Sequence, residues 1–101
     1  MTKDKNPFIW ELRIGLHNQV HFIRISPEVL ARQSIQAVAD YATGRSFTVW
    51  ESEAQKHYKI QVKNMERRYP HSKTNKNAYL IDTTNGYGVL FASIHKIKGQ
   101  P

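Results

Sequence analysis

The chain has 101 residues, 40% of them hydrophobic and 11% aromatic, with 15 lysines and arginines against 8 aspartates and glutamates. This length predicts a single domain over residues 1–101, and the hydrophobic content is too high for a wholly disordered protein. The sequence contains no cysteine, which excludes disulfides, a thiolate zinc site, an iron–sulfur cluster and a cysteine nucleophile. No apolar run approaches the roughly 18 residues of a membrane span and no signal-peptide pattern is present, so we expect a cytoplasmic protein without a membrane partner.

The first element predicted along the chain is a β-hairpin. Apolar and polar side chains alternate from Phe8 to Leu16, which is typical of a half-buried strand. The residues His17-Asn18-Gln19 suit a tight turn, and the segment from Val20 to Ile25 then predicts a second strand. We expect the two strands to pair antiparallel, with their apolar faces on the same side.

A helix is predicted to follow, starting at Pro27 and ending before Gly44. Ser26 can cap its N-terminus, and proline has its φ angle preset for the first helical position. Apolar residues between Leu30 and Ala42 recur at helical spacing on one broad face. Gly44 can adopt the positive φ of a helix end, and the β-branched and aromatic residues 47–50 predict a short strand after it.

Residues 52–69 permit two interpretations. In a strand, the three apolar residues from Tyr58 to Val62 would alternate with outward polar ones, which leaves one helix on a larger sheet and moves the lysines onto a sheet face. In a helix, Ser52 and Gln55 have the capping-box spacing, an apolar stripe runs along one side, and Pro70 ends the pattern. We choose the helix, because it also gathers four cations within about 80° of arc. These cations are Lys56, Lys59, Lys63 and Arg67.

The remaining segments predict a loop and a second hairpin. Residues 70–78 are polar and basic with no apolar period, which indicates a mobile loop. Residues 79–84 and 87–94 flank Asn85-Gly86, the dipeptide favoured in type I′ turns. Pairing across that turn places Leu80 opposite Phe91. We expect residues 1–6 and 97–101 to be flexible.

The predicted fold class is therefore α+β, in the order strand, strand, helix, strand, helix, strand, strand. The sheet is expected to be mostly antiparallel, built from two hairpins and one short strand. Two helices are expected to pack on one of its faces.

The charge distribution is more informative about function than the net charge of +7. Residues 1–55 carry six basic and six acidic side chains, whereas residues 56–101 carry nine basic side chains and only two acidic ones. A one-sided basic surface suits a polyanion, because neutralised phosphates release condensed counterions. We therefore predict a small nucleic-acid-binding domain, for DNA or RNA, as a monomer or homodimer.

The candidate binding residues are the cations of residues 56–76 and a tyrosine near the final hairpin turn that could stack on a base. They are Lys56, Lys59, Lys63, Arg67, Arg68, Lys73, Lys76 and Tyr87. The alternative function is a protein-interaction or inhibitor module whose basic surface docks on an acidic protein partner. Both functions are compatible with the same composition.

The histidine pattern does not predict an enzyme, a cofactor or a metal site. His17 and His21 are four residues apart, but on a predicted hairpin and with no carboxylate at matching spacing. The catalytic alternative is a metal-independent ribonuclease that uses His57 or His71 as its base, but nothing in the sequence makes an acid and a base converge.

Overall fold

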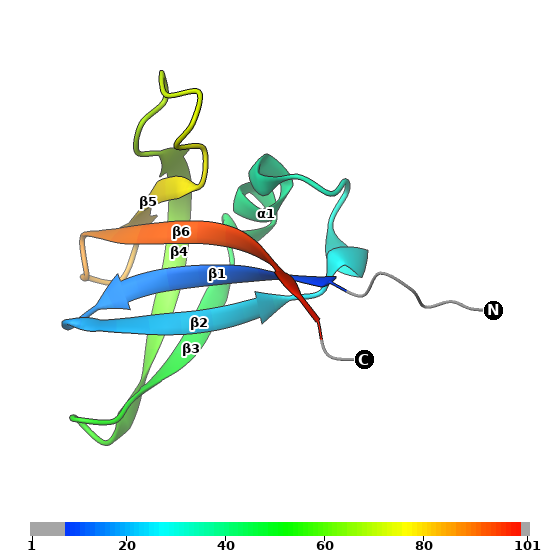
Figure 1. Cartoon of the computed structure of the whole chain (residues 1–101). Helices are drawn as coiled ribbons and strands as arrows, with labels where there is room; N and C mark the ends of the chain where they lie inside the picture. Colours follow the sequence, from blue (N-terminus) through cyan, green and yellow to red (C-terminus); the bar gives the residue numbers. More distant parts are fainter. Residues whose placement is uncertain (1–7, 100–101) are drawn as a thin grey trace.

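Six antiparallel strands form one sheet in the computed structural model, which describes residues 8–99 (Figure 1). The strands are β1 (Phe8–Leu16), β2 (Gln19–Ile25), β3 (Ser46–Glu51), β4 (Lys56–Arg67), β5 (Ala78–Thr83) and β6 (Val89–Lys98). A 3₁₀ turn, η1 (Pro27–Val29), and one α-helix, α1 (Ile35–Ala42), connect β2 to β3. Within residues 8–99, no helix is long and apolar enough to span a membrane.

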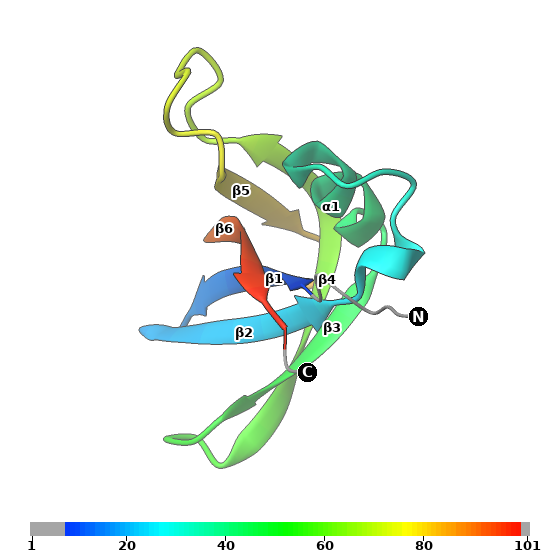
Figure 2. The same cartoon turned by 45° about the vertical axis from the view of Figure 1, so that its right-hand side comes forward.

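The sheet curls until its two ends almost meet. Its strand order is β2-β1-β6-β5-β4-β3, and every neighbouring pair is antiparallel. The end strands β2 and β3 approach each other without forming a hydrogen-bonded ladder, so the barrel is nearly closed (Figure 2). We call the side toward the barrel interior the inner face and the opposite side the outer face.

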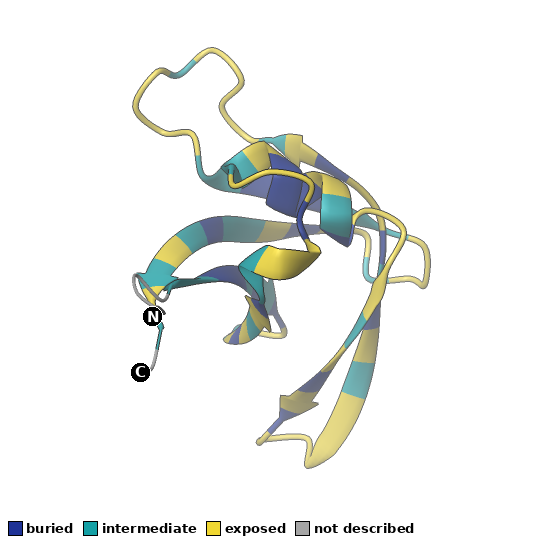
Figure 3. Ribbon diagram, turned by 90° about the vertical axis from the view of Figure 1, so that its right-hand side faces the viewer, coloured by how far each residue is buried: buried dark blue, intermediate teal, exposed yellow. Residues whose placement is uncertain are grey.

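The core lies on the inner face, where alternate residues of the strands face the barrel interior and α1 packs beside them. The helix packs against β4 and β6 and buries its small residues Ala37, Ala39 and Ala42 together with Val38 (Figure 3). Large buried side chains come from five strands: Leu12, Ile14, Ile25, Ile60, Val62, Ile81 and Ile94. Strand alternation thus places the apolar side chains inside.

The predicted α+β fold with two helices on one face is wrong, because residues 56–67 form β4 and not a helix. Ser52 and Gln55 do not make a capping box. They belong to the turn that joins β3 to β4, where Gln55 has a φ of 56° and its N–H donates to the Glu51 carbonyl at 2.8 Å. A β-bulge after Val62 then shifts the alternation by one residue, so that Met65 also points inward.

The predicted helix from Pro27 is also wrong in its extent. Ser26 does cap a start, but only of η1, and the α-helix begins eight residues later. There Ser34 is the N-cap, and its Oγ accepts from the Ala37 N–H at 3.1 Å. Gln33 ties the intervening segment down, since its side chain donates to the Pro27 carbonyl at 2.9 Å and accepts from the Trp10 indole N–H at 3.0 Å.

Both predicted hairpins are confirmed, although their turns differ from expectation. His17 and Asn18 have φ angles of 53° and 63°, so the two-residue loop between β1 and β2 has positive φ at both positions, as a type I′ turn requires. Leu80 pairs with Phe91 as predicted. Asn85 does not have the positive φ of a type I′ turn. Its side chain instead bonds to the β4 backbone, donating to the Lys59 carbonyl at 2.6 Å.

The short strand predicted over residues 47–50 corresponds to β3, and Gly44, with a φ of 87°, lies just after the end of α1 as expected. Residues 1–6 and 100–101 of the expected flexible ends lie outside the described residues, while β6 continues through Lys98. The mobility expected for residues 70–78 stays a prediction.

Two histidines and a glutamate join the ends of the sheet. Glu51 of β3 is 4% exposed, and one of its carboxylate oxygens lies 3.4 Å from His21 Nε2 of β2 and 3.3 Å from His17 Nδ1. His21 is also buried. A buried polar group is costly without a partner, so each of these side chains satisfies the other where no backbone ladder exists.

We expect Glu51→Ala to lower the free energy of unfolding by about 1–3 kcal/mol, because it leaves the His21 ring buried without a partner. Urea denaturation followed by tryptophan fluorescence measures this change. The control is Glu53→Ala, which alters an exposed carboxylate two residues away in the β3–β4 turn. Equal unfolding midpoints for the two variants would contradict this role of Glu51.

Candidate functional site

The four cations that were predicted on one helix face lie on two different faces of strand β4. Lys59 and Lys63 are exposed on the outer face. Lys56 lies opposite Glu51 on the inner side of the β3–β4 hairpin, with its Nζ 5.5 Å from the Tyr58 ring centroid. Arg67 pairs with the buried Tyr79 and also faces inward. The expected single row of four cations is therefore wrong, because side chains alternate along a strand.

Arg67 holds the loop that follows β4. Its terminal guanidinium nitrogen donates to the carbonyls of Tyr69, Ser72 and Asn75 at 3.0, 2.9 and 3.2 Å. Residues 68–77 form a loop that projects beyond the barrel and carries the exposed residues Lys73 and Lys76 (Figure 1). The Arg67 guanidinium thus organises the loop, and the two lysines remain at its surface.

Arg68 lies on the outer face, next to an aromatic ring. Its guanidinium carbon is 4.1 Å from the ring centroid of Phe91 and 5.2 Å from that of Tyr69. Phe91 belongs to β6 and is 58% exposed. A guanidinium over a ring face is a favourable cation–π contact.

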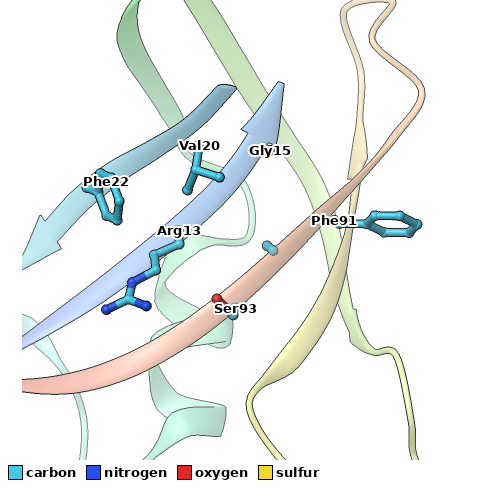
Figure 4. A pocket seen from close by; sticks show the side chains of 7 residues that line it. Arg13, Gly15, Val20, Phe22, Phe91 and Ser93 are labelled. Carbon is cyan, nitrogen blue, oxygen red and sulfur yellow. The ribbon is translucent and has the colours of Figure 1, made fainter. Parts of the chain in front are cut away.

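A shallow apolar groove crosses the outer face beside Phe91 (Figure 4). Its volume is about 560 Å³, and its floor lies at Gly15 of β1, which has no side chain. Figure 4 shows Phe22 and Val20 on β2 at one side of the groove and Phe91 on β6 at the other. Phe22 is 60% exposed, so two large aromatic rings stand at the surface of one sheet face.

One arginine lines the same groove and, together with Arg24, covers the acid Glu11. Arg13 lies on the groove wall, with its guanidinium carbon 5.6 Å from the Phe22 ring centroid. Its Nε donates to one oxygen of Glu11 at 2.8 Å, and Arg24 Nε lies 3.8 Å from the other oxygen. Glu11 is buried, so the accessible charge at this part of the surface is basic.

Tyr87 is less available than its position near the hairpin turn indicates. It is half-buried, and its ring centroid lies 5.8 Å from that of His17 and 6.3 Å from that of Tyr58. This aromatic cluster fills the inner side of the β3–β4 hairpin. Tyr87 is therefore separated from the two phenylalanines, which lie on the outer face.

The contacts of the histidines in the structure differ from those that their spacing in the sequence indicates. Glu51, far along the chain, brings its carboxylate to both His17 and His21, although no group of three His, Asp or Glu residues in the described range is arranged to hold a metal ion. His57 packs against Trp50, with ring centroids 5.0 Å apart. His71 lies in the loop beyond the other end of β4, roughly 30 Å away along a strand that rises about 3.3 Å per residue.

Sequence reasoning missed Phe22, Phe91 and Arg13 as candidate site residues. Phe91 carried a signal, because the predicted β5–β6 register places apolar residues on both faces of that hairpin. The signal of Phe22 was its place opposite Arg13 in the β1–β2 hairpin, on the face away from the alternating core residues. Comparisons with protein-family models, with curated proteins and with solved structures give no match to this chain.

Burial and the Arg13 guanidinium lower the pKa of His95, against the opposite effect of the Glu11 carboxylate. The neutral ring with its proton on Nε2 fits its contacts, since it can donate to Ser93 Oγ at 2.7 Å and accept at Nδ1 from the Asn77 amide at 3.5 Å. Proton binding is then weaker in the folded than in the unfolded state. The stability due to this histidine is present above pH about 6.5 and is lost as the pH falls through the folded pKa.

We expect the His95 ring protons to titrate with a midpoint below about 6.5, the ordinary histidine value. Proton NMR of the imidazole resonances against pH measures this, with a His95→Gln variant used to assign the signal. A midpoint at or above the ordinary value would show that burial and Arg13 do not control this ring.

Proposed function

We propose that this chain binds single-stranded nucleic acid across the outer face of its sheet. The observation that carries the proposal is the pair of exposed rings, Phe22 and Phe91, which flank one groove with a guanidinium beside each ring. Unpaired bases stack on such rings, gaining about 1–3 kcal/mol each, whereas arginines can bond to phosphates or stack on bases.

The position of the basic residues supports the same function. Lys59 and Lys63 extend the basic surface along β4, about 13 Å apart for four residues of strand. Arg68 links them to the loop that carries Lys73 and Lys76. A backbone that follows this surface would meet cations at intervals, and the net charge of +7 would speed its association.

A single strand suits the site better than a duplex. Exposed rings gain stacking energy only from bases that are not already stacked in a helix. The one α-helix of residues 8–99 has eight residues and packs its apolar side on β4 and β6, so it is not presented for a major groove. We assign phosphate contacts to the basic strand and loop, in place of the helix face that the sequence predicted. The cytoplasmic location stays a prediction.

The second candidate is docking on an acidic protein partner. It is favoured by the exposed aliphatic residues Val20 and Val89, which add apolar area near the groove but have no ring to stack on a base. The unpaired edge of β2 could also receive a partner strand. The two functions differ in whether the rings themselves or only their apolar area are required.

We expect the double variant Phe22→Leu with Phe91→Leu to weaken binding of a labelled single-stranded DNA or RNA by about tenfold or more, because it removes two stacking surfaces. Fluorescence anisotropy measures the affinity. The comparison variant, Val20→Ala with Val89→Ala, removes apolar area without removing a ring and should lose less affinity than the leucine variant. If the valine variant loses affinity and the leucine variant does not, apolar docking and not stacking is the function of this face.

We expect Lys59→Glu with Lys63→Glu to lower the affinity and the salt dependence of binding. Removing one lysine–phosphate interaction should reduce the slope of log affinity against log salt by about 0.7 for a single strand. Anisotropy at several salt concentrations measures the slope, and Arg32→Glu, which alters an exposed cation before α1, serves as the control. An unchanged slope in the double variant would remove β4 from the binding surface.

A further inference from the structure

A second concave site lies between the start of α1 and the loop of residues 68–77. Two adjoining cavities of about 290 and 430 Å³ share the residues Ile35 and Lys76. We call their combined space the α1–loop cleft. Its other lining residues are Gln36, Arg67, Thr74, Asn77, Tyr79, Ile94, His95 and Lys96.

The cleft is basic. Arg67, Lys76 and Lys96 line it, and no acidic residue in the described part of the chain does. Two acids lie near its walls: Asp40, one turn along α1, accepts from the Gln36 amide at 3.0 Å, and Glu11 of β1 is the cross-strand partner of His95 but is paired with Arg13 and Arg24. Within residues 8–99, neither Lys76 nor Arg67 forms an ion pair with a carboxylate. The positive charge of the cleft is therefore not neutralised by its own walls.

Hydrogen-bond donors accompany these cations. Asn77 and Thr74 supply an amide and a hydroxyl, whereas the buried Tyr79 hydroxyl at the wall already donates its proton to the Gln36 side-chain oxygen at 3.2 Å. Arg67 Nε is buried without a hydrogen-bond partner, although the same guanidinium donates to three loop carbonyls. Cations and neutral donors around one cavity are the groups that bind a phosphate oxygen.

The first turn of α1 adds to this potential. Ile35 and Gln36 are its first two residues and line the cleft. The N–H groups of the next two residues are bonded to Ser34, whose Oγ accepts from Ala37 and whose carbonyl oxygen accepts from Val38. The N–H groups of the first two residues have no partner within the helix, and the helix dipole favours negative charge near them.

We propose that the α1–loop cleft binds a phosphate group, and that it receives the terminal phosphate of the bound strand. The second clause rests on the proposed function, whereas the first stands without it. A terminal phosphate monoester carries about −1.5 to −2 charges at pH 7, while each internal diester carries one, so the three cations fit the monoester better.

Consecutive residues connect the cleft to the outer face. Arg67 lines the cleft, and Arg68 lies over the Phe91 ring on the outer face. A bound nucleic-acid strand whose bases lie on Phe91 could therefore pass around the protein backbone at Arg67 and Arg68 and end with its terminal phosphate in the cleft. The loop held by Arg67 forms one wall of that path.

The first experiment is an NMR titration of the full chain with inorganic phosphate at constant ionic strength, with chloride as the reference anion. We expect saturable shifts of the Gln36, Lys76 and Asn77 amides. Lys76→Gln should weaken phosphate binding by about tenfold, because it removes a charged donor. The matched control is Lys73→Gln, which removes an exposed charge of the same loop that does not line the cleft.

Two results of this titration would overturn the phosphate site. One is the absence of saturable shifts at these amides. The other is equal weakening by Lys76→Gln and Lys73→Gln, which would mean that the whole loop attracts anions without a defined site. Neither result depends on whether nucleic acid binds the outer face.

The second experiment compares otherwise identical single-stranded oligonucleotides with a 5′-phosphate, a 3′-phosphate or hydroxyl groups at both ends. We expect one phosphorylated end to raise the affinity about tenfold by anisotropy, and Lys76→Gln to abolish that gain. Equal affinities of all three would overturn the assignment to a strand end while the phosphate site stands. Failure of all three to bind, beside a positive phosphate titration, would overturn the proposed function.

Discussion

The rest of this structure depends on how its antiparallel sheet closes, because the two end strands, β2 and β3, meet without pairing. Five ladders join the six strands, and at the remaining junction a buried contact between His21 of β2 and Glu51 of β3 replaces backbone hydrogen bonds. Closure encloses the alternating apolar residues together with the small residues of α1. It also turns the opposite side of every strand outward, and this creates the continuous surface on which Phe22 and Phe91 lie with Gly15 between their strands.

The hairpins could be predicted because their signals are local. Alternation in residues 8–25 and 79–94 is set by neighbours in sequence, and the pairing of Leu80 with Phe91 follows from the turn position alone. The error at residues 52–69 has a specific origin. The bulge after Val62 makes the inward residues Tyr58, Val62 and Met65 recur at spacings of four and three, which imitates a helix. Ile60, the one apolar residue that did not fit the helix, is fully buried in the strand.

The basic part of the candidate site was visible in the sequence, whereas its aromatic part was not. Lys59, Lys63, Lys73, Lys76 and Arg68 are all exposed, because burial of an unpaired charge is costly in any fold. Phe22 and Phe91 become candidate site residues because they flank the groove, whose sides come from β2 and β6 on either side of β1. That arrangement requires the pairing of β1 with β6, about 80 residues apart in sequence, and no local pattern encodes it.

The single extra residue in β4 sets the phase of everything that follows it in that strand. Uninterrupted alternation would turn Met65 and Arg67 outward and Glu66 and Arg68 inward. The core would lose a thioether, the loop would lose the guanidinium that gathers its three carbonyls, and a carboxylate would enter the interior. Neighbouring residues of a strand face opposite sides in either phase, so the one inserted amino acid determines which of the two arginines holds the loop and which lies on the outer face. Deleting that amino acid would exchange the roles of Arg67 and Arg68 without altering either residue.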